Sequence, residues 1–284
     1  MYRFSLLAFL LPFAICHSLV SAQSRADVAR ERAEYAAWIA SAPNSPLGAI
    51  AHQPIGGGIR LGPADADIPL DGLAEHRVSE RGGAVTLASG SQSRPLPRGR
   101  PVQLGEYTVA VDGAPGRAVL TVFGPSHRGK APEHYPYDPS AVFVGPMAPP
   151  ERPGAVRILA LDGVEAEATE AGSVTVTIGG AKVRLLVRRI PSGDAEESEL
   201  EIFFRDDTNG KGTYPAGRFV SLIPEGGGKY RLDFNRSRNP FCAYSSAYPC
   251  PLPWRGNIIP APIPAGEKYL GGGLTAPPTG EKAG

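Results

Sequence analysis

From Ile50 to Asn235 the chain is a succession of short apolar or alternating runs separated by glycine, proline and aspartate. Such runs, rich in β-branched residues, are typical of β-strands. They read IRLG, HRVS, AVTLAS, VQLGEYTVAV, RAVLTVFG, AVFVG, AVRILALDG, SVTVTI, KVRLLVRRI, LEIFF, RFVSLI and YRLDFN. The 35 glycines and 30 prolines among 284 residues are roughly double average usage, as many turns between short strands require. We predict a mainly β fold, with antiparallel sheets in a sandwich-like or barrel-like arrangement.

Three glycine-containing turns indicate antiparallel pairing. Gly82-Gly83 and Gly179-Gly180 each separate two β-like runs and can supply the positive φ angles of tight hairpins. Asn209-Gly210 fits a type I′ turn, in which both central residues have positive φ. Runs that are neighbours along the chain are therefore expected to pair as hairpins.

One stretch of helical character precedes the β-like runs. In SRADVARERAEYAAWIASAP, Ser24 suits the N-cap position, Asp27 follows three residues later, and Pro43 lies beyond the end. An apolar stripe follows the helical repeat at Val28, Tyr35, Trp38 and Ile39. We predict a packing helix within residues 23–43, as the one N-terminal helix of the fold.

The first 22 residues have the pattern of a secretory signal peptide. Arg3 precedes an apolar run, residues 6–15, and Val20-Ser21-Ala22 forms a small-residue cleavage site. The run is too short for a bilayer, which needs about 20 residues. We expect an exported protein, periplasmic or extracellular, without stable membrane insertion after cleavage. A lipoprotein would use Cys16, but the residues just before it lack the expected small side chain.

The rest of the chain divides into three parts. Residues 44–125 form an N-terminal β region, and residues 126–270 a second β region with a cysteine-containing loop. Residues 271–284 carry no core residues, and we predict a disordered tail.

The charge balance narrows the classes of partner. The chain holds 29 basic and 28 acidic residues, and loss of Arg3 with the signal peptide makes the two numbers equal. Since no excess of positive charge remains, we expect no nucleic-acid partner and no anionic membrane surface.

Two cysteines remain after cleavage, Cys242 and Cys250. In an oxidising compartment a lone pair of cysteines is expected to form a disulfide. The closed loop is short, so the chain-entropy contribution would be about 2.6 kcal/mol. Pro249 and Pro251 flank the second cysteine and stiffen the loop.

Metal, cofactor and nucleophile motifs give no assignment. DDTNGKGT resembles a calcium loop, but Lys211 and Arg218 stand where the fifth and twelfth positions need oxygen ligands. The sequence contains neither H-E-x-x-H nor G-x-S-x-G. We therefore predict no metal and no cofactor, and leave catalytic residues unknown.

The run IRLGPADADIPLDGLAEHRVSERGGAVTLASG, residues 59–90, resembles the opening of a forkhead-associated β-sandwich. That family binds phosphopeptides through an arginine after the glycine, where this chain has Pro63. The resemblance thus implies a sandwich-like fold without the phosphate-binding donors.

A more specific resemblance covers roughly residues 130–270. FFRDDTNGKGTYPAGRF, LDFNRSRNPFCAY, CPLPWRGNII and PAGEK, preceded by HYPYDPSAVFVG, resemble the family called domain of unknown function 1684. The chain departs from the family pattern at Arg238 and at Ile258-Ile259. The retained polar positions are our candidate ligand-binding residues: Asp206, Thr208, Tyr214, Arg218, Asp233, Asn235, Arg236 and Asn239.

This cluster has three interpretations. The leading one is a pocket for a small polar ligand, a carboxylate or a sugar, with Tyr214, Tyr244 or Trp254 as an apolar wall. The second is a hydrolase acting on a glycan or ester, with Asp206 or Asp233 as general acid or base. The third is a structural module without a ligand, in which the arginines and aspartates pair and the asparagines satisfy loop backbone.

Overall fold

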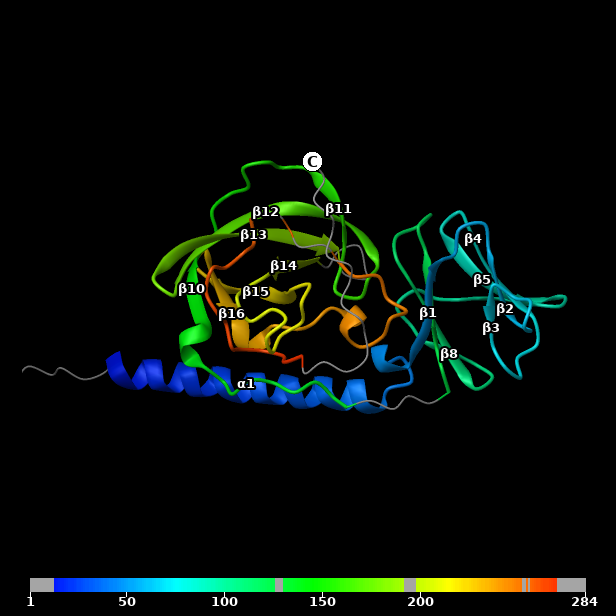
Figure 1. Ribbon diagram of the computed structural model, residues 1–284. Coiled ribbons are helices and arrows are strands. Elements are labelled where there is room, and N and C mark those ends of the chain that lie inside the picture. The colour runs from blue at the N-terminus through cyan, green and yellow to red at the C-terminus, as the bar shows by residue number, and fades with distance from the viewer. Residues whose placement is uncertain (1–12, 126–129, 192–197, 252–253, 255, 270–284) are drawn as a thin grey trace, which may run out of the picture.

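The computed structural model describes residues 13–125, 130–191, 198–251, 254 and 256–269, with side chains from Ser24 onward. One long helix lies along a curled sheet, and a smaller β region stands beside them (Figure 1). The predicted mainly β fold with one N-terminal helix is confirmed; within the described ranges no sheet closes into a barrel. Most of the predicted signal peptide, residues 1–12, and the predicted disordered tail, residues 271–284, lie outside the described residues.

The N-terminal β region is a sandwich of two sheets. The first has the order β1 (Ala49–Pro54), β9 (Val119–Phe123), β8 (Tyr107–Asp112), β7 (Val102–Leu104). The second has the order β3 (Ile68–Pro69), β2 (Ile59–Gly62), β4 (His76–Arg81), β5 (Ala84–Ser89), β6 (Gln92–Pro95). Apolar side chains of both sheets form one core, among them Leu61, Val78, Val109 and Leu120. Only the short β2–β3 pair among the described strands is parallel.

The second β region is a single antiparallel sheet of seven strands. Its order is β10 (Val142–Pro146), β16 (Lys229–Asp233), β15 (Arg218–Gly226), β14 (Ser198–Phe204), β13 (Ala181–Pro191), β12 (Glu165–Ile178), β11 (Ala155–Leu159). Its inner face is apolar, with Leu185, Ile202 and Phe204 fully buried. Four short 3-10 helices lie in the connections: η1 (Pro46–Gly48), η2 (Pro139–Ala141), η3 (Phe234–Arg236) and η4 (Phe241–Ala243).

The seven-stranded sheet curls so that the segment after β10 reaches β12. Just after β10, the backbone of Ala148 exchanges hydrogen bonds of 2.8 and 3.0 Å with Ser173 of β12. The approach is possible because β12 bulges at Gly172, where a Cβ atom would lie 2.2 Å from the Ala148 carbonyl oxygen. Only glycine fits there.

Helix α1 (Phe13–Ser41) begins well before Ser24. Ser24 therefore lies inside the helix, and its predicted role as N-cap is wrong. The sequence has no glycine or proline between Pro12 and Pro43, so nothing interrupts the helix at Ser24. Side chains that α1 buries or half-buries recur with the helical repeat, among them Ser24, Val28, Arg32, Tyr35 and Ile39.

Two of the three predicted hairpin turns are confirmed. Gly82-Gly83 joins β4 to β5 and Gly179-Gly180 joins β12 to β13, all with positive φ. The type I′ prediction for Asn209-Gly210 is wrong, because no described residue other than glycine has positive φ. The Asn209 side chain instead bonds within its loop, accepting from the Asp206 N–H and donating to the Tyr214 carbonyl, both at 2.6 Å.

A fully buried ion pair ties the sheet to the C-terminal segment. Arg218 of β15 donates to Asp206 Oδ2 at 2.7 Å, and both side chains have no exposed surface. Arg218 also donates to the carbonyl oxygens of Ile263 and Ala265. Asp206 Oδ1 accepts from the Thr208 N–H at 2.8 Å and from the Ile263 N–H at 3.2 Å. The pairing of arginine with aspartate that the third interpretation expects is therefore present at Arg218 and Asp206.

The loop after β16 brings Cys242 and Cys250 together. They are separate thiols in the structure, and both sulfurs lie near the Tyr214 hydroxyl, at 3.3 and 3.4 Å. Burial raises the pKa of the Cys242 thiol. The disulfide stays a prediction.

We predict that Asp206→Asn lowers the free energy of unfolding by about 3–5 kcal/mol, because it leaves the Arg218 charge buried without a counterion. Urea unfolding of purified protein measures this loss. Asp207→Asn is the matched control, since its side chain is exposed one residue away. Equal losses for the two variants would contradict the structural role of the pair.

We also predict that protein recovered from an oxidising compartment takes up no alkylating reagent under denaturing, non-reducing conditions, because the expected disulfide would join Cys242 to Cys250. Intact mass before and after reduction counts the thiols that become available. Labelling of two thiols without reduction would rule out the pairing.

Candidate functional site

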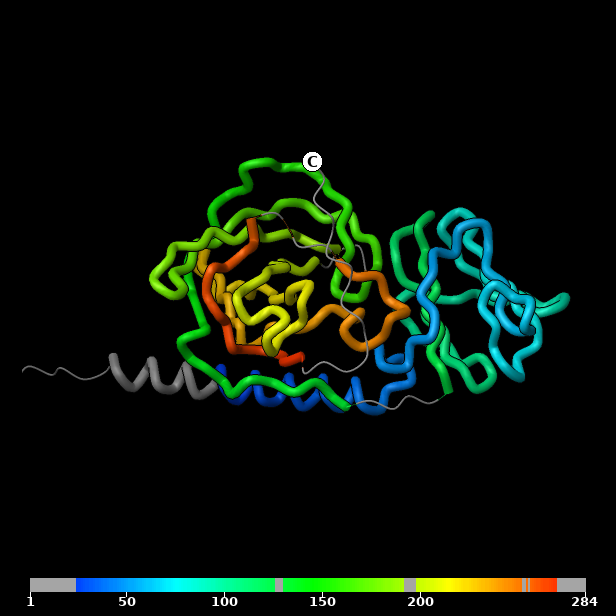
Figure 2. Tube along the Cα trace, viewed as in Figure 1, coloured from blue at the N-terminus to red at the C-terminus, as the bar shows by residue number. Residues whose placement is uncertain are grey.

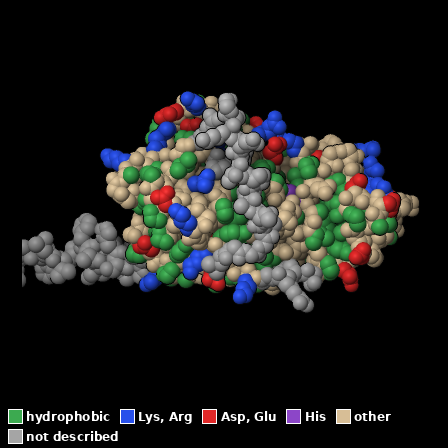
Figure 3. All heavy atoms as spheres, in the orientation of Figure 1, with side chains coloured by type: hydrophobic (Ala, Val, Ile, Leu, Met, Phe, Trp, Pro, Cys, Tyr) green, Lys and Arg blue, Asp and Glu red, His purple; other side chains and the backbone are tan. Residues whose placement is uncertain are grey.

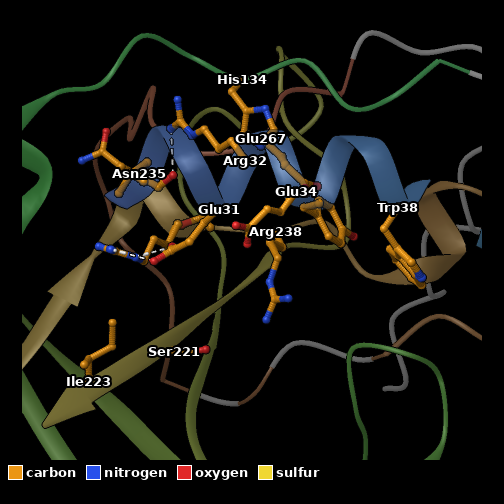
Figure 4. A pocket seen from close by; sticks show the side chains of 14 residues that line it. Glu31, Arg32, Glu34, Trp38, His134, Ser221, Ile223, Asn235, Arg238 and Glu267 are labelled. Atoms are coloured by element: carbon orange, nitrogen blue, oxygen red, sulfur yellow. Dashed lines mark hydrogen bonds and ion pairs between the residues drawn. The ribbon is translucent and has the colours of Figure 1, made fainter. Parts of the chain in front are cut away.

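A cavity of about 500 Å³ lies between α1 and the outer face of the curled sheet. Figure 4 shows α1 along one side, Ser221 and Ile223 of β15 below, and His134 on the opposite side of the helix. The lining residues are Val28, Glu31, Arg32, Glu34, Tyr35, Trp38, His134, Ser221, Ile223, Asn235, Arg236, Ser237, Arg238 and Glu267. Three stretches distant in sequence therefore share one cavity with the helix.

Backbone hydrogen bonds hold these stretches side by side. The Glu267 N–H donates to the Ser237 carbonyl at 2.9 Å, and the Lys268 N–H donates to the backbone carbonyl of Glu133 at 2.8 Å. An antiparallel bridge joins His134 to Glu267. Figure 2 shows the C-terminal segment passing between the sheet and the helix. The Arg218 bonds to Ile263 and Ala265 fix this segment just before Glu267.

Glu267 is the most deeply buried charged group at the cavity, with no exposed surface. Its Oε2 accepts from the Asn239 N–H and from the Tyr244 hydroxyl, both at 2.7 Å. Its Oε1 is buried and has no hydrogen-bond partner among the described residues. Burial raises the pKa of Glu267 to about 7, although these two donors and the charges of Arg238 and Arg218 lower it.

Arg32 enters the cavity from α1. Its Nη1 donates to the Tyr135 carbonyl at 2.9 Å and its Nη2 to the Asn235 carbonyl at 2.8 Å, the contact dashed in Figure 4. The Nε–H is buried and has no partner within the described chain. Desolvation lowers the Arg32 pKa, while the charges of Asp233 and Glu267 raise it, and a guanidinium remains a cation.

A second arginine at the cavity is fully paired. Arg236 donates to Asp233 Oδ2 at 2.5 Å, and through Nε and Nη2 to both Glu31 oxygens, at 2.8 and 3.1 Å. Asp233 also caps η3 by accepting from the Asn235 N–H at 2.9 Å. The Asn235 amide bonds to the backbone N–H and carbonyl of Asp138, each at 2.8 Å. This network fixes α1 to the sheet.

Arg238 lies between two buried carboxylates. It is 4.0 Å from Glu201 of β14 and lies over the Tyr35 ring, 5.9 Å from its centroid. Burial raises the Glu201 pKa to about 7, which the charge of Arg238 opposes. The charge of Arg238 also lowers the pKa of Glu267.

His134 is a neutral group at the cavity. Burial, and then the charge of Arg32, lower its pKa to about 4. At neutral pH the imidazole therefore carries no charge and can both donate and accept.

The sequence-predicted site residues separate into two groups. Asn235 and Arg236 line the cavity, Asp233 orients Arg236, and Asn239 donates to Glu267. The others do not line this cavity, because their side chains bond inside the protein around the ion pair and the cysteine loop: Asp206, Thr208, Tyr214 and Arg218. Of the suggested aromatic wall, Tyr244 contacts Glu267, whereas Trp254 packs against Phe203 and Phe219 away from the cavity.

The sequence prediction missed Arg32, His134 and Glu267. Arg32 had a signal, since an arginine stands four residues after Val28 and three before Tyr35, inside the apolar stripe. Glu267 and His134 lie in two of the motifs that carry the family resemblance, PAGEK and HYPYDPSAVFVG. Nothing local in the sequence indicates that these three residues meet.

Other features of the described residues bear on the class of site. No group of three or more His, Cys, Asp or Glu side chains within the described ranges could hold a metal ion. No described helix has a stretch apolar and long enough to cross a membrane. Basic and acidic side chains are interspersed on the face shown in Figure 3.

We predict that Glu267 makes the stability depend on pH. Its folded-state pKa of about 7 lies above the ordinary value of 4.5, so its contribution is present below pH 4.5 and is lost as the pH rises through 7. Relative to Glu267→Gln, the wild-type free energy of unfolding should fall by on the order of 2 kcal/mol between pH 5 and pH 8. Urea unfolding across this range measures the difference, and parallel curves would contradict it.

The comparison with family models agrees with the resemblance in sequence. The model of the family described as "Protein of unknown function (DUF1684)" matches residues 130–268. The solution NMR structure of an uncharacterised protein of Haloarcula marismortui is similar, with 27% identity, a TM-score of 0.42, and coverage of 49% of this chain and 76% of that chain. No curated protein matches. The stretch from residue 130 to residue 268, which holds the seven-stranded sheet and Glu267, thus matches the model of the DUF1684 family of proteins of unknown function.

Proposed function

We propose that the cavity under α1 binds a small polar ligand, a carboxylate or a sugar. One observation carries the proposal: Arg32, Ser237 and Glu267 line this cavity, and each has a buried polar atom, Nε, Oγ and Oε1 respectively, without a hydrogen-bond partner among the described residues. Buried polar atoms are rarely left unpaired, because each costs about 1–3 kcal/mol. A ligand with polar groups at these positions satisfies them.

The shape and lining of the cavity suit such a ligand. A volume of about 500 Å³ lies within the range of small-molecule sites. Tyr35 and Trp38 lie 5.6 Å apart, centroid to centroid, on the helix side and supply aromatic surface. Sugars and hydroxy acids have both an apolar part and groups that form directional hydrogen bonds. Aromatic side chains suit the apolar part, and charged side chains suit the polar groups.

We also propose that the protein binds this ligand after export. Cleavage after Ala22, as the sequence predicts, leaves the α1 residues that line the cavity, Val28 to Trp38, in the mature chain. The binding site is therefore compatible with removal of the signal peptide.

A hydrolase acting on a glycan or ester is the second candidate. Glu267, with a pKa raised to about 7, and the neutral His134 line the same cavity. A carboxylic acid with this pKa is a suitable general acid near pH 7, whereas His134, with its pKa lowered to about 4, is neutral but only a weak base. Asp206, considered as an acid or base, has both oxygens engaged in the interior. A screen of chromogenic esters and glycosides tests this candidate, and absence of turnover would count against it.

We predict that glucuronate or lactate stabilises the protein, and that Arg32→Lys weakens binding by about tenfold or more. The variant keeps the positive charge but loses the planar Nε–H group. Calorimetric titration and the shift in melting temperature measure the effect.

Arg30→Lys is the matched control, because it makes the same change on the exposed face of α1, where Arg30 pairs with Asp27. It should bind as the wild type does. Equal affinity of the two variants, or no binding of glucuronate, lactate or glucose to the wild type, overturns the proposed site.

A further inference from the structure

The two oxygens of Glu267 have different roles. Oε2 already accepts two hydrogen bonds, from the Asn239 N–H and the Tyr244 hydroxyl, both at 2.7 Å. A proton on this oxygen would face two donors. When Glu267 is protonated, the proton must therefore be on Oε1, the buried oxygen without a partner among the described residues.

A protonated Glu267 turns this end of the cavity into a donor site. Its Oε1–H and the Nε–H of Arg32 are then two unpaired donors on residues that line one cavity. A carboxylate offers two acceptor oxygens and a negative charge, and so suits two donors of which one is cationic. A neutral sugar carries no charge that could pair with Arg32, and its binding does not require Glu267 to be protonated.

We propose that the cavity selects a carboxylate over a neutral sugar, and that Glu267 takes up one proton from solvent as the carboxylate binds. This inference rests on the proposed function. In the bound state the Oε1–H of Glu267 donates to one carboxylate oxygen of the ligand, and the second carboxylate oxygen of the ligand faces Arg32. The proton comes from the buffer, the ligand stays an anion, and no other bond forms or breaks.

Among the ionisable groups near the cavity, Glu267 is the one expected to change its protonation state near neutral pH. On α1, Arg32 and Tyr35 interact electrostatically with Glu267. Glu31 and Glu34, also on α1, line the same cavity. Arg218 faces it from β15, Arg238 from the loop after η3, Tyr244 from the end of η4, and His134 from the neighbouring segment. The arginines stay charged, the pKa of Tyr35 is raised by burial, and that of His134 is lowered to about 4.

The pKa of free Glu267, raised to about 7, sets the pH range of the effect. An anionic ligand beside it raises the value further, because like charges disfavour ionisation. At pH 8 glucuronate binding should take up nearly one proton, and at pH 5.5 almost none. Above pH 7 the dissociation constant should rise by about tenfold per pH unit.

Calorimetric titration of the whole protein with glucuronate, in buffers of different ionisation enthalpy, measures the number of protons taken up. Glucose is the matched neutral probe, and its weaker binding should involve no proton. Glu267→Gln places an amide N–H where Oε1–H would lie. It should bind glucuronate at pH 8 as tightly as the wild type does at pH 5.5, with no uptake and no pH dependence.

Glu201→Gln identifies which carboxylate is responsible, because burial also raises the Glu201 pKa to about 7. On binding glucuronate, this variant should take up as many protons as the wild type does. Glucuronate binding without proton uptake, or loss of binding in Glu267→Gln at every pH, overturns this inference and leaves the proposed site standing. Absence of binding by glucuronate, lactate and glucose at every pH overturns the proposed function itself.

Discussion

The buried ion pair of Arg218 and Asp206 organises the second β region. A buried guanidinium needs partners for its charge and its donors, and the two Nη groups of Arg218 reach Asp206 and the carbonyl oxygens of Ile263 and Ala265. Its Nε–H has no partner among the described residues. These contacts fix the C-terminal segment across the sheet. Glu267, two residues further on, is thereby buried beside α1. The pair thus positions one wall of the cavity.

The cavity also depends on α1, which lies outside the stretch that matches the family. The helix supplies Arg32, Tyr35 and Trp38, whereas the family segment supplies Glu267 and His134. The paired Arg236, which contacts Glu31 and Asp233, holds the two parts together. In this chain the site is therefore built jointly by the N-terminal helix and the family segment.

Local sequence patterns predicted most of the fold, because strands and hairpins follow from residues close in sequence. The alternating runs and the turns at Gly82-Gly83 and Gly179-Gly180 are examples. The site was predicted only in part. Asn235 and Arg236 follow from family-like motifs, but Arg32 lies 203 residues from Asn235, its backbone partner. Only the folded sheet brings them together, and no periodicity encodes that contact. Asn209 shows the opposite case, in which a side chain bonding inside its loop overrides a turn signal.

The central claim is that Glu267 is a buried carboxyl group which protonates near neutral pH with Oε1 unpaired. Carbon-13 NMR of protein labelled at the glutamate side-chain carboxyl carbon, with Glu267→Gln to assign the signal, measures its titration directly. The structure predicts a midpoint of about 7, assigned to the signal that the variant lacks. A midpoint near the ordinary value of 4.5 would show that Glu267 is solvated and charged, and would contradict the account of the cavity.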